Sequence, residues 1–182
     1  MEQNISRKEK KLLLEIARNA ILSLYGNEII PAREETEPLL LEKRGCFVCI
    51  KINGKLRGCI GNFVSDQPLH QLVREMAVSA ATRDPRFYPL RKEELGESTL
   101  EISVLTPLQK VSSIEEIEVG KHGLYIEKNT ARGVLLPQVA TEYGWDRETF
   151  LSQTSIKAGM MADSWKEGAD IYIFGAEVFN EA

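Results

Sequence analysis

The chain has 182 residues, of which 43% are hydrophobic and 27% charged, and its formal net charge is −4. These proportions exclude a disordered protein, and the acidic balance argues against a broad nucleic-acid-binding face while leaving a local basic patch open. A chain of this length buries roughly 70% of its unfolded surface as a single domain. We expect one domain over residues 1–182, located in the cytoplasm because residues 1–26 hold no apolar run long enough for a signal core or a membrane span.

The first predicted element is a helix that begins after Ser6, which can form a capping box with Glu9, and that ends at Gly26. Its buried face consists of apolar residues at helical spacing, namely Leu13, Ile16, Ala17, Ala20, Ile21 and Leu24. A loop rich in Pro and Glu is predicted over residues 31–45. Two strands follow at residues 46–52 and 55–63, joined by Asn53-Gly54, the dipeptide that best suits a type I′ hairpin turn.

A second helix is predicted from about residue 66 to the break at "RDPRF". It buries Leu69, Leu72, Val73, Met76, Ala77 and Ala80. Farther along, "STLEISVLTP" alternates as a strand, "SSIEEI" is a short capped helical turn, and "HGLYIEK" with "RGVLLPQVA" forms a second strand pair. Asp146 caps a helix that runs to Ala158, and "DIYIFGAEVF" is predicted as one closing strand. This mixture, without strict strand–helix alternation, favours an α+β fold with a mainly antiparallel sheet, flanking helices, and room for a large and a small lobe.

The hairpin carries all three cysteines, Cys46, Cys49 and Cys59. A two-residue turn places Cys59 opposite Val48 and on the same face as Cys46, whereas Cys49 lies on the other face. The Cys46–Cys49 spacing suits a metal knuckle, but a strand directs residues three apart to opposite faces. We therefore expect free thiols, with no zinc site and no disulfide among the three cysteines.

Arg57 and Cys59 are two residues apart and are expected to share one side of the hairpin. A guanidinium beside the sulfur would favour the thiolate, and Gly58 and Gly61 could admit a ligand or another backbone close to the strand. The alternative is structural, because cysteine is often buried and glycine can mark a bulge.

"LRGCIG", at residues 56–61, together with "DPRF", "HGL", "LLPQVA", "GWD" and "KAG", resembles the AMMECR-one domain family and covers nearly the whole chain. The resemblance is to the branch found in the AmmeMemoRadiSam system, which implies a Memo-type protein and a radical-SAM protein as partners. Many microbial members have Thr-Cys before "KAG", whereas this chain has Thr154-Ser155. No cofactor is expected, since the chain lacks a radical-SAM cysteine triplet and phosphate-binding or HExxH motifs.

Two hypotheses follow for function. In the first, the protein is a thiol-dependent enzyme or a substrate-handling subunit in which "RGCIG", "DPRF" and "HGL" converge on one cleft, with Cys59 as nucleophile and His122 as acid or base. Arg57, Gly58, Gly61, Arg86 and Lys157 would then bind the substrate, a small molecule or an RNA. In the second, the protein is a non-catalytic binding module or adaptor for a small anion, an RNA or a partner protein. Each charged candidate also has a structural explanation: a salt bridge for Arg86, a hydrogen-bonded cap for His122, and the helix dipole for Lys157.

Overall fold

The structure is a computed structural model that describes residues 4–26 and 37–181. The chain divides into two compact units, a larger one that comprises Met1–Leu105 and Glu177–Ala182 and a smaller one that comprises Thr106–Ala176. Each unit has its own four-stranded sheet and its own hydrophobic core. The predicted α+β class, with mainly antiparallel strands and flanking helices, is confirmed.

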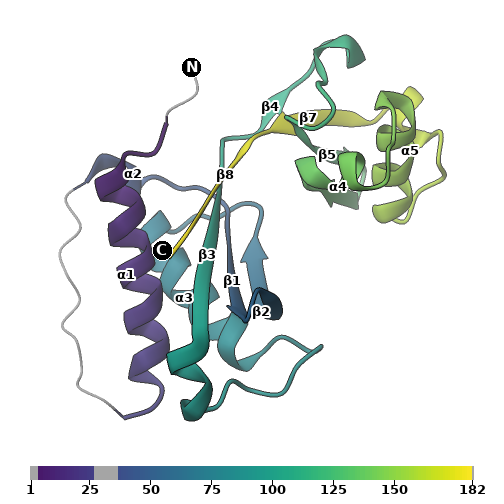
Figure 1. Cartoon of the computed structure of the whole chain (residues 1–182). Helices are drawn as coiled ribbons and strands as arrows, with labels where there is room; N and C mark the ends of the chain where they lie inside the picture. Colours follow the sequence, from purple (N-terminus) through teal and green to yellow (C-terminus); the bar gives the residue numbers. More distant parts are fainter. Residues whose placement is uncertain (1–3, 27–36, 182) are drawn as a thin grey trace. The chain divides into compact units, whose positions relative to one another are not determined.

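The larger unit is a sheet in the order β2-β1-β3-β8 with helices packed against it (Figure 1). Its elements are α1 (Arg7–Ser23), α2 (Pro38–Leu41), β1 (Cys46–Ile52), β2 (Lys55–Asn62), α3 (Leu69–Thr82), the 3-10 helix η1 (Lys92–Glu97), β3 (Ser98–Leu105) and β8 (Ala176–Asn180). The α3 helix packs on β1 and β2, while α1 packs on α3 and β3. Alternate residues of β1, namely Cys46, Val48 and Ile50, are buried in this core.

The smaller unit has a sheet in the order β4-β7-β5-β6. Its elements are β4 (Gln109–Lys110), η2 (Ile114–Glu116), β5 (Gly123–Lys128), β6 (Ala131–Leu135), α4 (Pro137–Glu142), α5 (Arg147–Lys157), η3 (Ser164–Lys166) and β7 (Asp170–Phe174). The α5 helix packs on β5 and β6. Phe150 and Leu151 of this helix are fully buried in the unit's core.

The helix caps and buried helix faces, whose prediction rests on residues a few positions apart, were confirmed with one exception. Ser6 and Glu9 form the capping box of α1, and Asp146 caps α5 by accepting the Thr149 N–H. The six apolar residues predicted for the second helix are all buried in α3, although that helix begins at Leu69. Leu24 is the exception on the first helix, because it is 41% exposed and lies beyond the last residue of α1.

Three predictions of the chain path were wrong. The strand predicted over "RGVLLPQVA" ends at Leu135, because Pro137 begins the helix α4. The segment "DIYIFGAEVF" is not one strand, because it divides at Gly175 into β7 of the smaller unit and β8 of the larger unit. The predicted loop over 31–45 contains the short helix α2, which Pro38 initiates, and residues 31–36 of that loop lie outside the described residues. None of the helices within residues 4–26 and 37–181 combines the length and the apolar character that crossing a membrane requires.

Candidate functional site

The hairpin register differs from the prediction because β2 contains a bulge. Lys51 pairs with Leu56, but Ile50 pairs with Gly58, so Arg57 is an extra residue without a partner on β1. From this point the register is shifted by one residue. Cys59 therefore lies opposite Cys49, and the predicted pairing of Cys59 with Val48 is wrong.

Cys49 and Cys59 form a disulfide, which contradicts the expectation that no disulfide links the hairpin cysteines. Their Cα atoms are 4.0 Å apart, as suits directly opposed residues that exchange no backbone hydrogen bonds. Both residues are half-buried and lie on the face of the sheet opposite the core. Cys46 is a free thiol on the core face, and burial raises its pKa to about 12.

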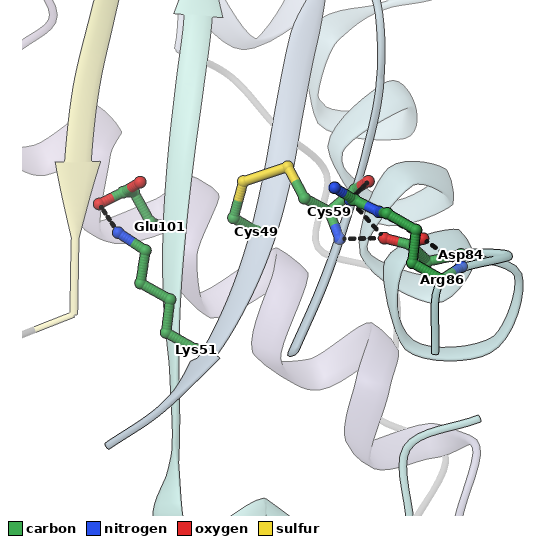
Figure 2. The surroundings of a disulfide bond; sticks show 6 residues. All are labelled: Cys49, Lys51, Cys59, Asp84, Arg86 and Glu101. Carbon is green, nitrogen blue, oxygen red and sulfur yellow. Dashed lines mark hydrogen bonds and ion pairs between the residues drawn. A yellow bond between two sulfur atoms is a disulfide. The ribbon is translucent and has the colours of Figure 1, made fainter. Parts of the chain in front are cut away.

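Figure 2 shows that an ion pair lies to each side of the disulfide. Beside Cys49, the Lys51 ammonium is 2.7 Å from the Glu101 carboxylate, and Glu101 is the residue directly opposite Cys49 on β3. Beside Cys59 lie Asp84 and Arg86 of the "DPRF" segment. The disulfide is thus held between two sets of charged side chains.

Asp84 and Arg86 occupy the position that a further strand would take beside the edge strand β2. The Asp84 carboxylate accepts the Cys59 N–H at 2.9 Å, and Arg86 donates to the Cys59 carbonyl at 3.4 Å. Arg86 also binds Asp84 through two side-chain hydrogen bonds of 3.0 and 2.7 Å. The backbone groups of Cys59 therefore point away from β1 and are satisfied by the two side chains, which protects the edge from pairing with another strand.

Arg57 turns from the bulge towards the segment that follows "DPRF". Its guanidinium donates to both carboxylate oxygens of Glu94, at 2.9 and 3.0 Å, and to the carbonyls of Tyr88 and Pro89, at 2.9 and 3.4 Å. These bonds use most of its five donors. The guanidinium holds the 88–94 segment against β2, and the predicted role of Arg57 as an anion holder stays a prediction.

The two hairpin glycines are required by close packing. A Cβ on Gly58 would lie 2.2 Å from the Ala80 carbonyl oxygen of α3, and one on Gly61 would lie 2.4 Å from the Cys46 carbonyl oxygen and the Phe47 ring. Of the two alternatives left open by the sequence, a close backbone approach accounts for Gly58. The same approach fixes the bulge, because Gly58 must be the residue that faces α3.

Asp84 contacts both Cys59 and Arg86, and its side chain is only 2% exposed. Hydrogen bonds from the Arg86 side chain, assisted by the backbone N–H groups of Cys59 and Arg86, hold the pKa of the Asp84 carboxyl well below its usual range. Motif comparison drew attention to Arg86 but missed Asp84 and Glu94 as the acids that organise both arginines. The signal for Asp84 was its place directly before Pro85, where an aspartate accepts local backbone N–H groups.

We predict that Asp84→Asn lowers the free energy of unfolding by about 2 kcal/mol at neutral pH, since an amide cannot replace the charged hydrogen bonds. The folded pKa of this carboxyl lies below the unfolded value, so its contribution is present above the unfolded pKa of about 4 and is lost as the pH falls towards the folded pKa. Urea unfolding at several pH values measures the difference between parent and variant.

The matched control is Asp66→Asn, which makes the same change at an exposed position. The control should unfold like the parent throughout. A difference between parent and Asp84→Asn that persists unchanged below pH 3 would contradict the assigned charge state of Asp84.

The other predicted site residues belong to the smaller unit. The Nδ1 atom of His122 accepts the Glu118 N–H at 3.1 Å, so the ring closes a turn before β5. Lys157 is exposed in the last turn of α5. Ser155 is fully buried in α5. The structure joins "RGCIG" to "DPRF", while the convergence of "HGL" with them stays a prediction.

Within the described residues, no group of three or more His, Cys, Asp or Glu side chains is arranged to hold a metal ion. The cluster therefore consists of a cross-strand disulfide, the buried Asp84 carboxylate and two guanidiniums near the Phe87 ring, 5.9 and 5.5 Å from its centroid. Chemically, such an arrangement can exchange disulfides, and it can form thiols when it is reduced.

Comparisons with known proteins agree on one family. A family model described as AMMECR1 matches residues 14–179. A protein of Methanosarcina barkeri is 41% identical over 95% of this chain and 90% of its own length, and one of Methanothermobacter thermautotrophicus is 43% identical over 97% and 96%. The crystal structure of an uncharacterised protein from Pyrococcus horikoshii superposes with a TM-score of 0.82 at 38% identity, covering 97% of this chain and 93% of that one.

Proposed function

The chain belongs to the AMMECR1 family, and we propose that it acts by reversible thiol–disulfide chemistry at Cys49 and Cys59. The observation that carries this proposal is the disulfide between an edge strand and its neighbour, which lies half-buried on the face of the sheet opposite the core. We assign Cys59 as the sulfur that the substrate attacks, since Cys59 lies on the outermost strand β2, whereas Cys49 lies on β1 between β2 and β3.

The position of the disulfide favours a chemical role over a stabilising one. A cross-link between residues ten apart removes at most about 3 kcal/mol of unfolded-state entropy. The Asn53-Gly54 hairpin already closes the same loop through its backbone ladder. A disulfide stabilises more when it closes a longer loop, and exposed disulfides are more easily reduced than structural ones.

In the proposed exchange, the thiolate of a dithiol substrate or protein attacks the Cys59 sulfur. A mixed disulfide forms between the attacking sulfur and Cys59, the Cys49–Cys59 bond breaks, and Cys49 leaves as a thiolate. The second thiol of the partner then attacks the mixed disulfide and releases Cys59 as a thiolate. Two electrons move from the partner to this protein, and the partner leaves as a disulfide. The reverse sequence reduces a disulfide substrate.

We also propose that the protein is the A component of the AmmeMemoRadiSam system and works in the cytoplasm with a Memo-type protein and a radical-SAM protein. The motif resemblance around "LRGCIG" supports this assignment. In a reducing cytoplasm a disulfide is typically transient, catalytic or redox-sensing, although hyperthermophilic organisms are an exception. The proposed location therefore fits a pair that cycles between dithiol and disulfide.

We predict that Cys49 and Cys59 titrate together as a two-electron couple with a midpoint above about −300 mV, because a disulfide that solvent can reach is reduced more easily than a buried structural one. Purified protein is equilibrated in glutathione or dithiothreitol buffers of graded potential, quenched with N-ethylmaleimide and examined by peptide mass spectrometry. Cys46 is the internal control and should stay unlabelled in the native protein, since it is buried with a raised pKa.

Two outcomes would contradict the proposal. The pair could remain oxidised in every buffer, which would make the bond purely structural. Alternatively, it could remain fully labelled even in the most oxidising buffers, which would show that the two thiols do not form a bond in solution.

A further inference from the structure

A second surface of the larger unit is independent of the cysteines. A groove of about 600 Å³ runs between α1 and β8. Its lining residues include Lys10, Lys11, Leu14 and Arg18 of α1 and Phe179 and Asn180 of β8. One wall is therefore a helix and the other a strand, and Leu14 and Phe179 provide an apolar floor.

The strand that forms one wall lies at an edge of the sheet, because β8 is the last strand in the order β2-β1-β3-β8 among the described residues. The Glu181 N–H donates to the Leu100 carbonyl of β3. Backbone direction alternates along a strand, so the N–H and C=O groups of Val178 and Asn180 point away from β3. Val178 is 53% exposed, and its outward N–H and C=O are the groups with which a further strand would pair.

The helix and the strand are aligned so that a peptide could contact both. Lys10 lies 2.6 Å from Glu177 and 5.9 Å from the Phe179 ring centroid, and Arg18 binds Glu181. From Lys10 to Arg18 the helix rises about 12 Å, and from Glu177 to Glu181 the strand extends about 13 Å. The two elements therefore run side by side in the same direction, with odd-numbered β8 residues facing α1.

The charged side chains that line the groove indicate which class of ligand it favours. Four lining residues are cationic and two are acidic. Lys10 and Arg18 form ion pairs with acids of the β8 segment. The Lys11 ammonium has a longer contact with the Glu15 carboxylate, at 3.9 Å, and the Lys11 side chain is 77% exposed. Arg7 is exposed at the same end. The rim therefore carries positive charge that favours an acidic ligand.

We propose that this groove binds an extended acidic peptide of a partner protein, which adds to β8 as a fifth strand. Its backbone hydrogen-bonds to Val178 and Asn180, and alternate side chains project towards α1. One apolar side chain of the peptide packs on Leu14 and Phe179. A carboxylate of the peptide, two residues away from it, forms ion pairs with Arg7 and Lys11. The geometry of an edge strand beside a helix favours a peptide over a compact small molecule, because it leaves a row of backbone groups to be paired.

The test is a selection of random peptides of about eight residues, a length that spans the strand, on the full chain. The Val178→Pro protein is added as a competitor, so that peptides that bind to surfaces other than the β8 edge are removed. The best peptide is then labelled with fluorescein and titrated by fluorescence polarisation. We expect alternating acidic and apolar residues, and a loss of about tenfold in affinity for Val178→Pro, which deletes an outward N–H and leaves the β3 ladder intact.

Lys11→Glu is a second variant that leaves the backbone unchanged and should also weaken binding about tenfold. Lys55→Glu makes the same charge change at an exposed hairpin position and should bind like the parent. Cys59→Ser should bind normally, so failure of the thiol proposal leaves this one intact. Enrichment of no peptide over the Val178→Pro competitor, or binding unaffected by Lys11→Glu, would overturn the inference. A dimer of the parent that Val178→Pro abolishes would overturn it too, since β8 would then pair with a second copy.

Discussion

Gly58→Ala is expected to lower the free energy of unfolding by about 3 kcal/mol, a large effect for one added methyl group. The new Cβ would lie 2.2 Å from the Ala80 carbonyl oxygen, which belongs to the backbone of α3 and cannot rotate away. Either α3 or the hairpin must move. Movement of the hairpin would also strain the bulge and the Cys59–Asp84 hydrogen bond. Urea unfolding of the purified variant measures the effect.

Gly96→Ala is the matched control, since a Cβ there has no neighbour within 4 Å and its φ is not in the left-handed region. That variant should be as stable as the parent or more stable by up to about 1 kcal/mol. If Gly58→Ala unfolded within about 0.5 kcal/mol of the parent, the close approach of β2 to α3 would not be what requires glycine at this position.

Cys59→Ser is expected to abolish the biological activity of the protein while leaving its fold intact. The side chain is half-buried on the open face of the sheet, so a hydroxyl can be solvated there, and the loss of stability relative to the reduced parent should be within about 1 kcal/mol. The measurement is complementation of a deletion strain whose defect the parent gene restores, alongside thermal unfolding of the purified variant under reducing conditions.

Cys49→Ser distinguishes the two kinds of thiol chemistry. If the function is exchange through the Cys49–Cys59 bond, both variants should fail to complement. If Cys59 is a lone nucleophile, Cys49→Ser should complement and only Cys59→Ser should fail. Full complementation by both variants, each folded like the parent, would remove the thiol proposal and leave the binding-module hypothesis, for which the α1–β8 groove is the candidate surface.

Sequence patterns predicted those parts of the fold that are decided by nearby residues. The α1 capping box, the Asn53-Gly54 turn and the buried face of α3 depend on residues within a few positions of each other, and all three were confirmed. Gly175 shows the limit of such patterns. It interrupts an otherwise continuous strand pattern at the point where the chain leaves one sheet and enters the other.

Sequence motifs placed "RGCIG" and "DPRF" together, and the structure joins these two segments, but the hairpin register and the disulfide were not predicted. The register of a two-residue hairpin follows from its turn only if no bulge intervenes, and this bulge is set by contacts from outside the hairpin. Ala80 of α3 demands a glycine at position 58, while Asp84 and Glu94 bind the backbone of Cys59 and the side chain of Arg57. The bulge shifts the register by one residue, so that Cys59 lies opposite Cys49 and not opposite Val48 as predicted. For this reason Cys59 forms a disulfide where a free thiol was predicted.

The Cys49–Cys59 bond is expected to open and close as the protein functions. Acid quenching of living cells, followed by alkylation with two isotopically distinct maleimides before and after reduction, measures the fraction of the pair that is oxidised. We expect a mixture of dithiol and disulfide that shifts towards disulfide within minutes of adding diamide and returns after its removal, with Cys46 unchanged throughout. A pair that stays wholly oxidised or wholly reduced under all these conditions would contradict it.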